Sequence, residues 1–95
     1  MGLHIEVSET AIATFGDIQE QIRGRLGNKA AKDFEKNMIR TFETLSNSPY
    51  MFKETAGDPN IRKGLIKKAS SFFYKVTEHQ IEILFFWDNR QEPVF

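Results

Sequence analysis

Apolar side chains in the first half of the chain recur at intervals of three and four residues, after one short alternating stretch. The alternation at residues 3–7 is typical of a half-buried strand, and Ser8 is a favourable helix N-cap. The helix predicted to follow carries its apolar side chains on one face, at Ala11, Phe15, Ile18, Ile22 and Leu26. Gly27 is expected to end this helix, and Asn28 to cap a second one.

The second predicted helix repeats the apolar stripe of the first. Its apolar positions are Ala31, Phe34, Met38, Phe42 and Leu45. Residues 46–49, with the sequence SNSP, end this helix, and residues 50–60 are predicted to form a loop. Because only a Gly-Asn turn joins the two helices, we expect an antiparallel hairpin whose stripes pack on a common partner.

Three short strands are predicted in the second half, at residues 61–68, 71–77 and 81–87. Glu78, His79 and Gln80 between the last two strands form a connection of hairpin length. The element order is therefore β-α-α-β-β-β, within a single domain spanning residues 1–95. This order predicts an α+β fold, with the helical hairpin packed on one face of a small, largely antiparallel sheet.

Two helices can cover only one face of such a sheet, yet apolar side chains are predicted on both faces. In the last strand, one face is expected to carry Ile81, Ile83, Phe85 and Trp87. The opposite face is expected to carry Leu84 and Phe86. In the preceding strand, Phe73 is expected to oppose Phe72, Tyr74 and Val76. An exposed apolar face favours partner binding, unless the loop at residues 50–60 or a second copy of the chain covers it.

Composition removes several classes of function. The 95 residues include nine phenylalanines and no cysteine, which excludes disulfides, thiolate chemistry and cysteine-based zinc sites. His4 and His79 are not spaced as metal ligands, and Ser70 and Ser71 lack the motif of an acyl-transfer nucleophile. We therefore expect no metal and no cofactor. Without a membrane-length apolar run or a signal peptide, the protein is expected to be cytoplasmic with no membrane partner.

Charge is neutral over the whole chain but unevenly distributed. Residues 59–77 contain five basic side chains and no acidic one, namely Arg62, Lys63, Lys67, Lys68 and Lys75. This local excess predicts a basic face, whereas zero net charge argues against attraction of the whole molecule to nucleic acid. The simpler alternative is that these lysines keep a solvated strand edge from pairing with other chains.

Arg90, which follows the last strand, is the other candidate for anion chemistry. A guanidinium offers a planar fork of donors that suits phosphate. Cations around a scissile phosphate would stabilise the transition state of RNA cleavage. Alternatively, Arg90 pairs with Asp88 or Glu92 and fixes the chain end.

Two segments and the order of elements resemble the RelE/ParE superfamily of toxins from bacterial type II toxin–antitoxin modules. The sequence "GNKAAKDFEKNMIRTFETLSNSP" resembles the second helix of that family. The sequence "FFYKVTEHQIEILFFWDNRQEP" resembles its terminal hairpin and the arginine-containing loop that follows. The resemblance covers almost the entire chain. It implies a growth-inhibiting toxin, of the kind associated with plasmid stabilisation, which a cognate antitoxin neutralises.

Three functions are compatible with this resemblance. The first is a ParE-like toxin that binds a cellular target such as DNA gyrase, the second is a RelE-like mRNA endonuclease acting on the ribosome, and the third is an inactive relative that binds only its antitoxin. For an endonuclease, the resemblance implies catalytic roles for Arg62, Lys67, Lys68 and Arg90. However, Ser71 stands where RNA-cleaving members have an arginine. Those members also usually have a tyrosine or histidine after the arginine that follows the last strand, to help proton transfer, whereas residues 91–95 contain neither. These departures favour the first function.

An antitoxin partner is expected in all three cases. An acidic segment, partly disordered before binding, is expected to bind the second sheet face and the basic edge. The predicted contact residues are Lys63, Phe73, Lys75, Leu84 and Phe86. The sequence leaves open whether the protein also forms a homodimer.

Overall fold

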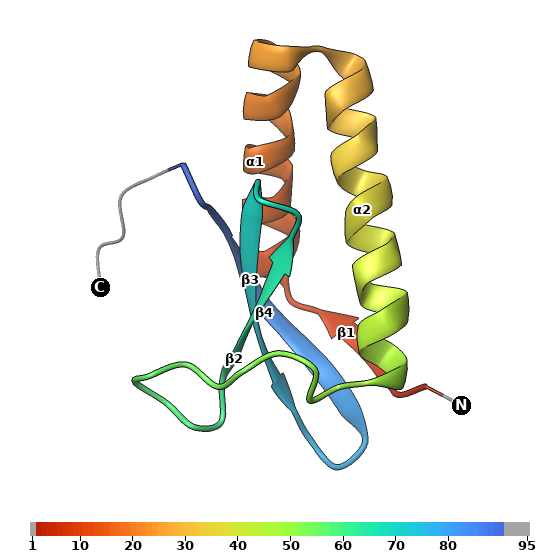
Figure 1. Cartoon of the computed structure of the whole chain (residues 1–95), viewed down its shortest axis with the longest axis vertical. Helices are drawn as coiled ribbons and strands as arrows, with labels where there is room; N and C mark the ends of the chain where they lie inside the picture. The colour runs from red at the N-terminus through yellow and green to blue at the C-terminus, as the bar shows by residue number, and fades with distance from the viewer. Residues whose placement is uncertain (1, 91–95) are drawn as a thin grey trace.

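The helices and strands occur in the predicted order in a computed structural model, which describes residues 2–90. They are β1 (His4–Val7), α1 (Glu9–Leu26), α2 (Asn28–Asn47), β2 (Arg62–Ile66), β3 (Ser70–Val76) and β4 (Gln80–Asp88). Figure 1 shows α1 and α2 as an upright hairpin beside the sheet. The predicted β-α-α-β-β-β fold is confirmed. Neither helix of the described residues is long and apolar enough to cross a membrane.

The two ends of α1 form for the reasons that the sequence suggests. The Ser8 hydroxyl accepts a hydrogen bond from the Ala11 amide at 3.0 Å and donates one to the Leu84 carbonyl at 2.8 Å. The N-cap therefore also ties α1 to β4. Gly27 has a φ of 94°, which glycine adopts without strain, so α2 begins directly after α1. The prediction that Asn28 caps α2 is wrong, because Asn28 is already helical and no side chain caps this end.

The sheet has the strand order β1-β4-β3-β2. β1 pairs with β4 in parallel, whereas β4 with β3 and β3 with β2 are antiparallel pairs. The largely antiparallel sheet is thus confirmed. The parallel pair places Ile5 opposite Ile81 and Val7 opposite Ile83, so the N-terminal strand extends the apolar surface on which the helices pack.

A β-bulge in β4 makes the predicted alternation of this strand wrong. Phe73 lies opposite Phe85 and Tyr74 lies opposite Ile83, so Leu84 is an extra residue between two paired positions. An extra residue reverses the side on which all later side chains of a strand project. The bulge therefore changes which face the C-terminal half of β4 presents to the helices.

Phe86 consequently belongs to the helix side of the sheet. It joins Ile81 and Ile83 in the core, rather than lying on the opposite face with Leu84 as expected. It is only 3% exposed, and its ring is 5.2 Å from that of Phe15 in α1. Phe85 and Trp87 were expected on the same face as Ile81 and Ile83. They instead pair with Phe73 and Ser71 of β3, on the face that points away from the helices.

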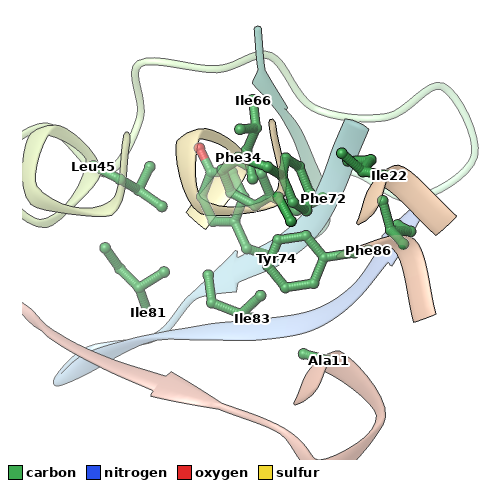
Figure 2. Close-up of a cluster of buried hydrophobic side chains, with 12 residues drawn as sticks. Ala11, Ile22, Phe34, Leu45, Ile66, Phe72, Tyr74, Ile81, Ile83 and Phe86 are labelled. Carbon is green, nitrogen blue, oxygen red and sulfur yellow. The ribbon is translucent and has the colours of Figure 1, made fainter. Parts of the chain in front are cut away.

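The core fills the space between the helices and the sheet, and Phe72 lies at its centre (Figure 2). Its ring contacts those of Phe42, Phe52 and Phe86, with centroids 5.2 to 6.0 Å apart. A Cβ atom on Gly64 would be 2.2 Å from Cζ of Phe72. Glycine at this position in β2 therefore lets the Phe72 ring lie against the strand backbone.

The loop at residues 50–60 closes the β2 end of the core. Its Phe52 ring packs on Phe72 and Tyr74. The Tyr74 hydroxyl donates to the Pro49 carbonyl at 2.9 Å, and burial raises the pKa of this hydroxyl. The loop thus packs on the helix side of the sheet, and the alternative that it covers the second face is wrong. Its next residues run beside β2, where the Lys63 amide donates to the Lys53 carbonyl.

Candidate functional site

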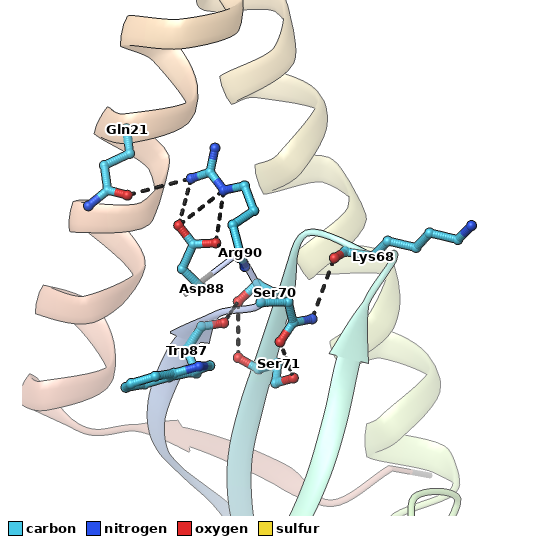
Figure 3. A network of polar contacts seen from close by, with 8 residues as sticks. Gln21, Lys68, Ser70, Ser71, Trp87, Asp88 and Arg90 are labelled. Atoms are coloured by element: carbon cyan, nitrogen blue, oxygen red, sulfur yellow. Dashed lines mark hydrogen bonds and ion pairs between the residues drawn. The ribbon is translucent and has the colours of Figure 1, made fainter. Parts of the chain in front are cut away.

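Arg90, the residue with the strongest sequence signal, is held by Asp88 at the end of β4 (Figure 3). Its Nε donates to Asp88 Oδ1 at 2.9 Å and its Nη2 donates to Oδ2 at 2.6 Å. Nε also lies 3.2 Å from Oδ2, and the Arg90 backbone amide adds a further hydrogen bond to Oδ1 at 2.9 Å. Gln21 of α1 accepts a further, longer bond of 3.5 Å from Nη2. The pair thus links the end of β4 to the first helix.

The electrostatics of this pair follow from its geometry. The Asp88 side chain is only 5% exposed, whereas that of Arg90 is 34% exposed. The Arg90 hydrogen bonds, which outweigh the opposing effect of burial, lower the pKa of the Asp88 carboxyl. The same hydrogen bonds raise the pKa of Arg90. This arrangement is the ion-pair alternative considered from the sequence. Residues 91–95 lie outside the described residues. Two predictions fall there, namely Glu92 as the alternative partner of Arg90 and the segment without tyrosine or histidine.

Arg62 is likewise engaged within the fold. Its Nη1 donates to the Phe52 carbonyl at 2.7 Å, and its Nη2 lies 3.3 Å from a carboxylate oxygen of Glu54. The guanidinium also stacks over the Tyr50 ring at 4.8 Å. These contacts fix the loop after α2, and they leave the Arg62 side chain only 19% exposed.

The four candidate catalytic residues do not form one cluster. Lys67 and Lys68 follow β2 in the turn that leads to β3, whereas Arg62 begins β2 at its other end. The chain neighbours of Lys68 and Arg90 are hydrogen-bonded to each other, since the Asn89 amide donates to the Ala69 carbonyl at 3.2 Å. This bond brings the backbone at Lys68 close to the backbone at Arg90. Figure 3 shows the Lys68 side chain extending away from the Arg90–Asp88 pair. The structure therefore brings Arg90 and the lysine turn to one end of the sheet and separates Arg62 from them.

The serine pair beside this turn is buried. Ser71 stands where the resemblance implies an arginine in RNA-cleaving proteins, and its hydroxyl donates to Asn89 Oδ1 at 2.7 Å. The Ser70 hydroxyl hydrogen-bonds the Trp87 carbonyl at 2.9 Å. Both serines are fully buried, so they tie β3 to β4. Within residues 2–90, no group of three or more His, Asp or Glu side chains is placed to hold a metal.

The second sheet face carries some of the predicted antitoxin contacts. Lys63 pairs opposite Phe73, and Lys75 lies 3.9 Å from Glu82. Phe73 stacks on Phe85 with centroids 4.6 Å apart and is only 7% exposed. The expectation of an open apolar patch around Phe73 is therefore wrong, since stacking of its ring contributes to its burial.

The main apolar cavity lies on the other side of the sheet, in a groove of about 790 Å³ between α1, α2 and β1. We call it the helix groove. Its walls include two exposed isoleucines, Ile12 of α1 at 62% and Ile39 of α2 at 46%. The other apolar residues that line it are Leu3, Ile5, Val7, Ala11, Phe15, Met38, Phe42 and Phe86. Phe86, expected on the opposite face, thus contributes to the lining of the helix groove.

Sequence reasoning missed the helix groove, although a signal was present. Ile12 directly follows Ala11, and Ile39 directly follows Met38; both preceding residues belong to the predicted stripes. The two isoleucines therefore make the apolar face of each helix wider than the area that the other helix covers. One end of the groove is polar, where Glu43, Ser46 and Asn47 line it. The groove is suited to an amphipathic segment rather than to a charged small molecule.

Comparisons with known proteins show the fold. No family model matches the chain, and no curated protein matches it. Among solved structures, the chain is similar to one described as the chromosomal ParDE TA system from P. aeruginosa, with a TM-score of 0.77 and 16% identity over 90% of this chain and 95% of that one. It is also similar to the YoeB dimer from Staphylococcus aureus, with a TM-score of 0.64 and 13% identity over 90% of this chain and 94% of that one. The RelE/ParE-like fold implied by the resemblance is confirmed.

Proposed function

We propose that this protein is the toxin of a type II toxin–antitoxin module, which inhibits growth by binding a cellular target and is neutralised by an antitoxin. The observation that carries this proposal is the likeness to a ParDE structure over nine tenths of the chain, at a TM-score of 0.77. The second likeness, to YoeB, has a lower TM-score of 0.64. We therefore favour a ParE-like target such as DNA gyrase.

The polar contacts support binding rather than catalysis. Cleavage of RNA by electrostatic stabilisation needs several cations directed at one phosphate. Here Asp88 accepts hydrogen bonds from Nε and Nη2 of Arg90, and the Phe52 carbonyl and Glu54 accept hydrogen bonds from Nη1 and Nη2 of Arg62. The position where the resemblance implies a further arginine holds the buried Ser71. An endonuclease that used Arg62 and Arg90 would have to release both guanidinium groups from these internal contacts in order to form its site.

The helix groove is the surface that we propose for the antitoxin. Amphipathic helices bind such grooves through apolar side chains spaced three and four residues apart. At 62% and 46% exposure, Ile12 and Ile39 would each contribute about 1–2 kcal/mol on burial. The contacts predicted at Lys63, Lys75 and Leu84 remain predictions for a further part of the same partner, whereas Phe73, at 7% exposure, offers that partner little surface.

Growth after induced expression tests this proposal. A ParE-like toxin should arrest growth, induce the SOS response and cause DNA breaks that depend on gyrase. Co-expression of the neighbouring reading frame should restore growth if that frame encodes the antitoxin. Unaltered gyrase supercoiling at toxic doses would rule out the gyrase target.

Codon-phased cuts in mRNA on translating ribosomes would instead support the endonuclease, provided that they disappear in Arg90→Ala. Normal growth at high expression would support an inactive relative. Each outcome thus selects one of the three functions.

A further inference from the structure

A second, smaller cavity lies on the other side of α2 from the helix groove. It has a volume of about 300 Å³ and is formed by α2, residues 51–52 of the loop and the end of β2. We call it the basic pocket, because two cationic side chains, Arg40 and Lys67, line it. Neither forms an ion pair with another residue between positions 2 and 90. Two cations therefore line one small pocket, and neither has an acidic partner in the described part of the chain.

The polar side chains of the basic pocket offer acceptors as well as donors. The Thr41 and Thr44 hydroxyls donate their protons to the carbonyls of Asn37 and Arg40 within α2, at 2.8 and 3.2 Å. Each hydroxyl oxygen keeps lone pairs with which it can accept a hydrogen bond. The Asn37 amide, which both donates and accepts, makes no hydrogen bond to the described residues. Donors beside acceptors match a peptide backbone.

The remaining walls of the basic pocket are aliphatic. Met51 is 46% exposed and Leu65 is 48% exposed, which are high values for large apolar side chains. Both line the pocket together with Arg40 and Lys67. A ligand that fits must therefore combine negative charge with apolar surface.

We propose that the basic pocket binds an acidic segment of a partner protein. One carboxylate of the segment lies between Arg40 and Lys67, and a neighbouring aliphatic side chain packs on Met51 and Leu65. The inference rests on the proposed function only for the source of the segment, since the antitoxin is the expected supplier. The antitoxin would then contact α2 on two sides, at the helix groove and at the basic pocket.

Nucleic acid fits the same pocket less well. Arg40 and Lys67 alone do not separate the two ligands, because a carboxylate and a phosphate both only accept hydrogen bonds. Single strands also need aromatic faces on which bases can stack. The one aromatic side chain of the pocket, Phe52, instead packs against Phe72 and Tyr74 in the core. Zero net charge removes the long-range attraction that nucleic-acid binding uses.

The backbone at Lys67 is consistent with a binding role. Its φ of 52° is the only positive value at a non-glycine residue between positions 2 and 90. Glycine would adopt this conformation without strain, whereas lysine does so at a cost. This turn places Lys67 in the lining of the pocket that Arg40 also lines, which supports a binding role for its ammonium group.

A titration followed by NMR tests the proposal on the isolated protein. The probe is a capped Leu-Glu-Leu-Glu peptide, and its controls are the matching Leu-Gln-Leu-Gln peptide and an eight-nucleotide oligouridylate. We expect saturable shifts of the Thr41, Thr44 and Leu65 amides with the acidic peptide and weaker ones with the glutamine peptide. Equal binding of the two peptides, preferential binding of the oligouridylate, or no shifts at these amides would each overturn the assignment.

Substitutions then locate the carboxylate. Arg40→Gln and Lys67→Gln should each weaken binding of the acidic peptide by about fivefold, the loss expected for one exposed charge pair. Lys32→Gln, on an exposed position of α2 outside the pocket, should leave the affinity unchanged. Lys67→Gly should weaken binding equally while raising the melting temperature, because it removes both the charge and the backbone strain. Unchanged affinity in Lys67→Gly would contradict the role of this ammonium group.

This experiment separates the pocket from the proposed function. Peptide binding without growth arrest in cells would leave the pocket established and the toxin proposal refuted. Growth arrest without peptide binding would give the reverse result.

Discussion

Replacement of Arg90 by alanine separates a structural ion pair from a catalytic arginine. Asp88 is 5% exposed and receives three guanidinium hydrogen bonds, at 2.9, 3.2 and 2.6 Å, besides the backbone amide of Arg90. In Arg90→Ala the carboxylate stays in place with only its backbone hydrogen bond. Because Arg90 is itself about one third exposed, we place the cost at about 2 kcal/mol, toward the lower end for a broken buried pair. For a domain of this length, this cost lowers the melting temperature by about 10 °C.

The loss should depend on pH in a defined direction. Arg90 lowers the pKa of Asp88 in the folded state, so the ion pair stabilises the fold fully at pH values above the unfolded pKa of about 4. This contribution is lost as the pH falls through the lower, folded pKa, where the carboxyl becomes protonated. The difference in unfolding free energy between wild type and Arg90→Ala should therefore be constant at neutral pH and shrink toward pH 2.

Urea denaturation followed by circular dichroism at several pH values measures this difference. The double variant Asp88→Asn with Arg90→Ala completes a thermodynamic cycle that isolates the pair. Arg90→Lys should recover only part of the loss, since an ammonium cannot reproduce the two parallel hydrogen bonds. If Arg90→Ala is as stable as wild type at pH 7, the pair is not holding the chain, and Arg90 is available to a ligand after all.

Three further predictions concern the core, the loop and the helix groove. Gly64→Ala should destabilise the fold by about 1–3 kcal/mol, because its Cβ would lie 2.2 Å from a buried ring atom of Phe72. The control Gly24→Ala, with open space around it, should be neutral or stabilising. Equal effects of the two substitutions in thermal melts would contradict the close packing at Gly64. Tyr74→Phe should cost about 1 kcal/mol in urea denaturation by removing its hydrogen bond to a loop carbonyl, and an unchanged midpoint would show that this bond does not hold the loop. Ile12→Glu combined with Ile39→Glu should leave the melting temperature nearly unchanged, because both side chains are exposed, yet weaken antitoxin binding more than tenfold in calorimetry.

The sequence was sufficient for the features that depend on local periodicity. The apolar stripes of the two helices, the cap at Ser8 and the stop at Gly27 are set by residues close together in the chain, and each is present. Leu26, predicted as the last residue of the α1 stripe, is the exception, because it is 69% exposed. The resemblance to the RelE/ParE superfamily added the fold, which the structural comparisons confirm. The loop at residues 50–60 was also predicted, although not the side of the sheet on which it packs.

The features that failed depend on non-local geometry. Alternation along β4 cannot reveal a bulge at Leu84, because the extra residue is defined only by its pairing with β3. That one residue moved Phe86 from the expected partner face to the helix side. The helix groove depends on how far apart two helices pack, and the Arg90–Asp88 pair was one of two alternatives that spacing alone could not separate.

The most direct test of a toxin that acts by binding and is neutralised at the helix groove is growth after induction, with and without the antitoxin. The wild-type protein and the variant Ile12→Glu with Ile39→Glu should both arrest growth when expressed alone. Co-expression of the antitoxin should restore growth to cells with the wild-type protein and leave cells with the variant arrested. Equal rescue of both proteins would contradict the groove as the antitoxin site, and growth without arrest in the wild type would contradict the toxin itself.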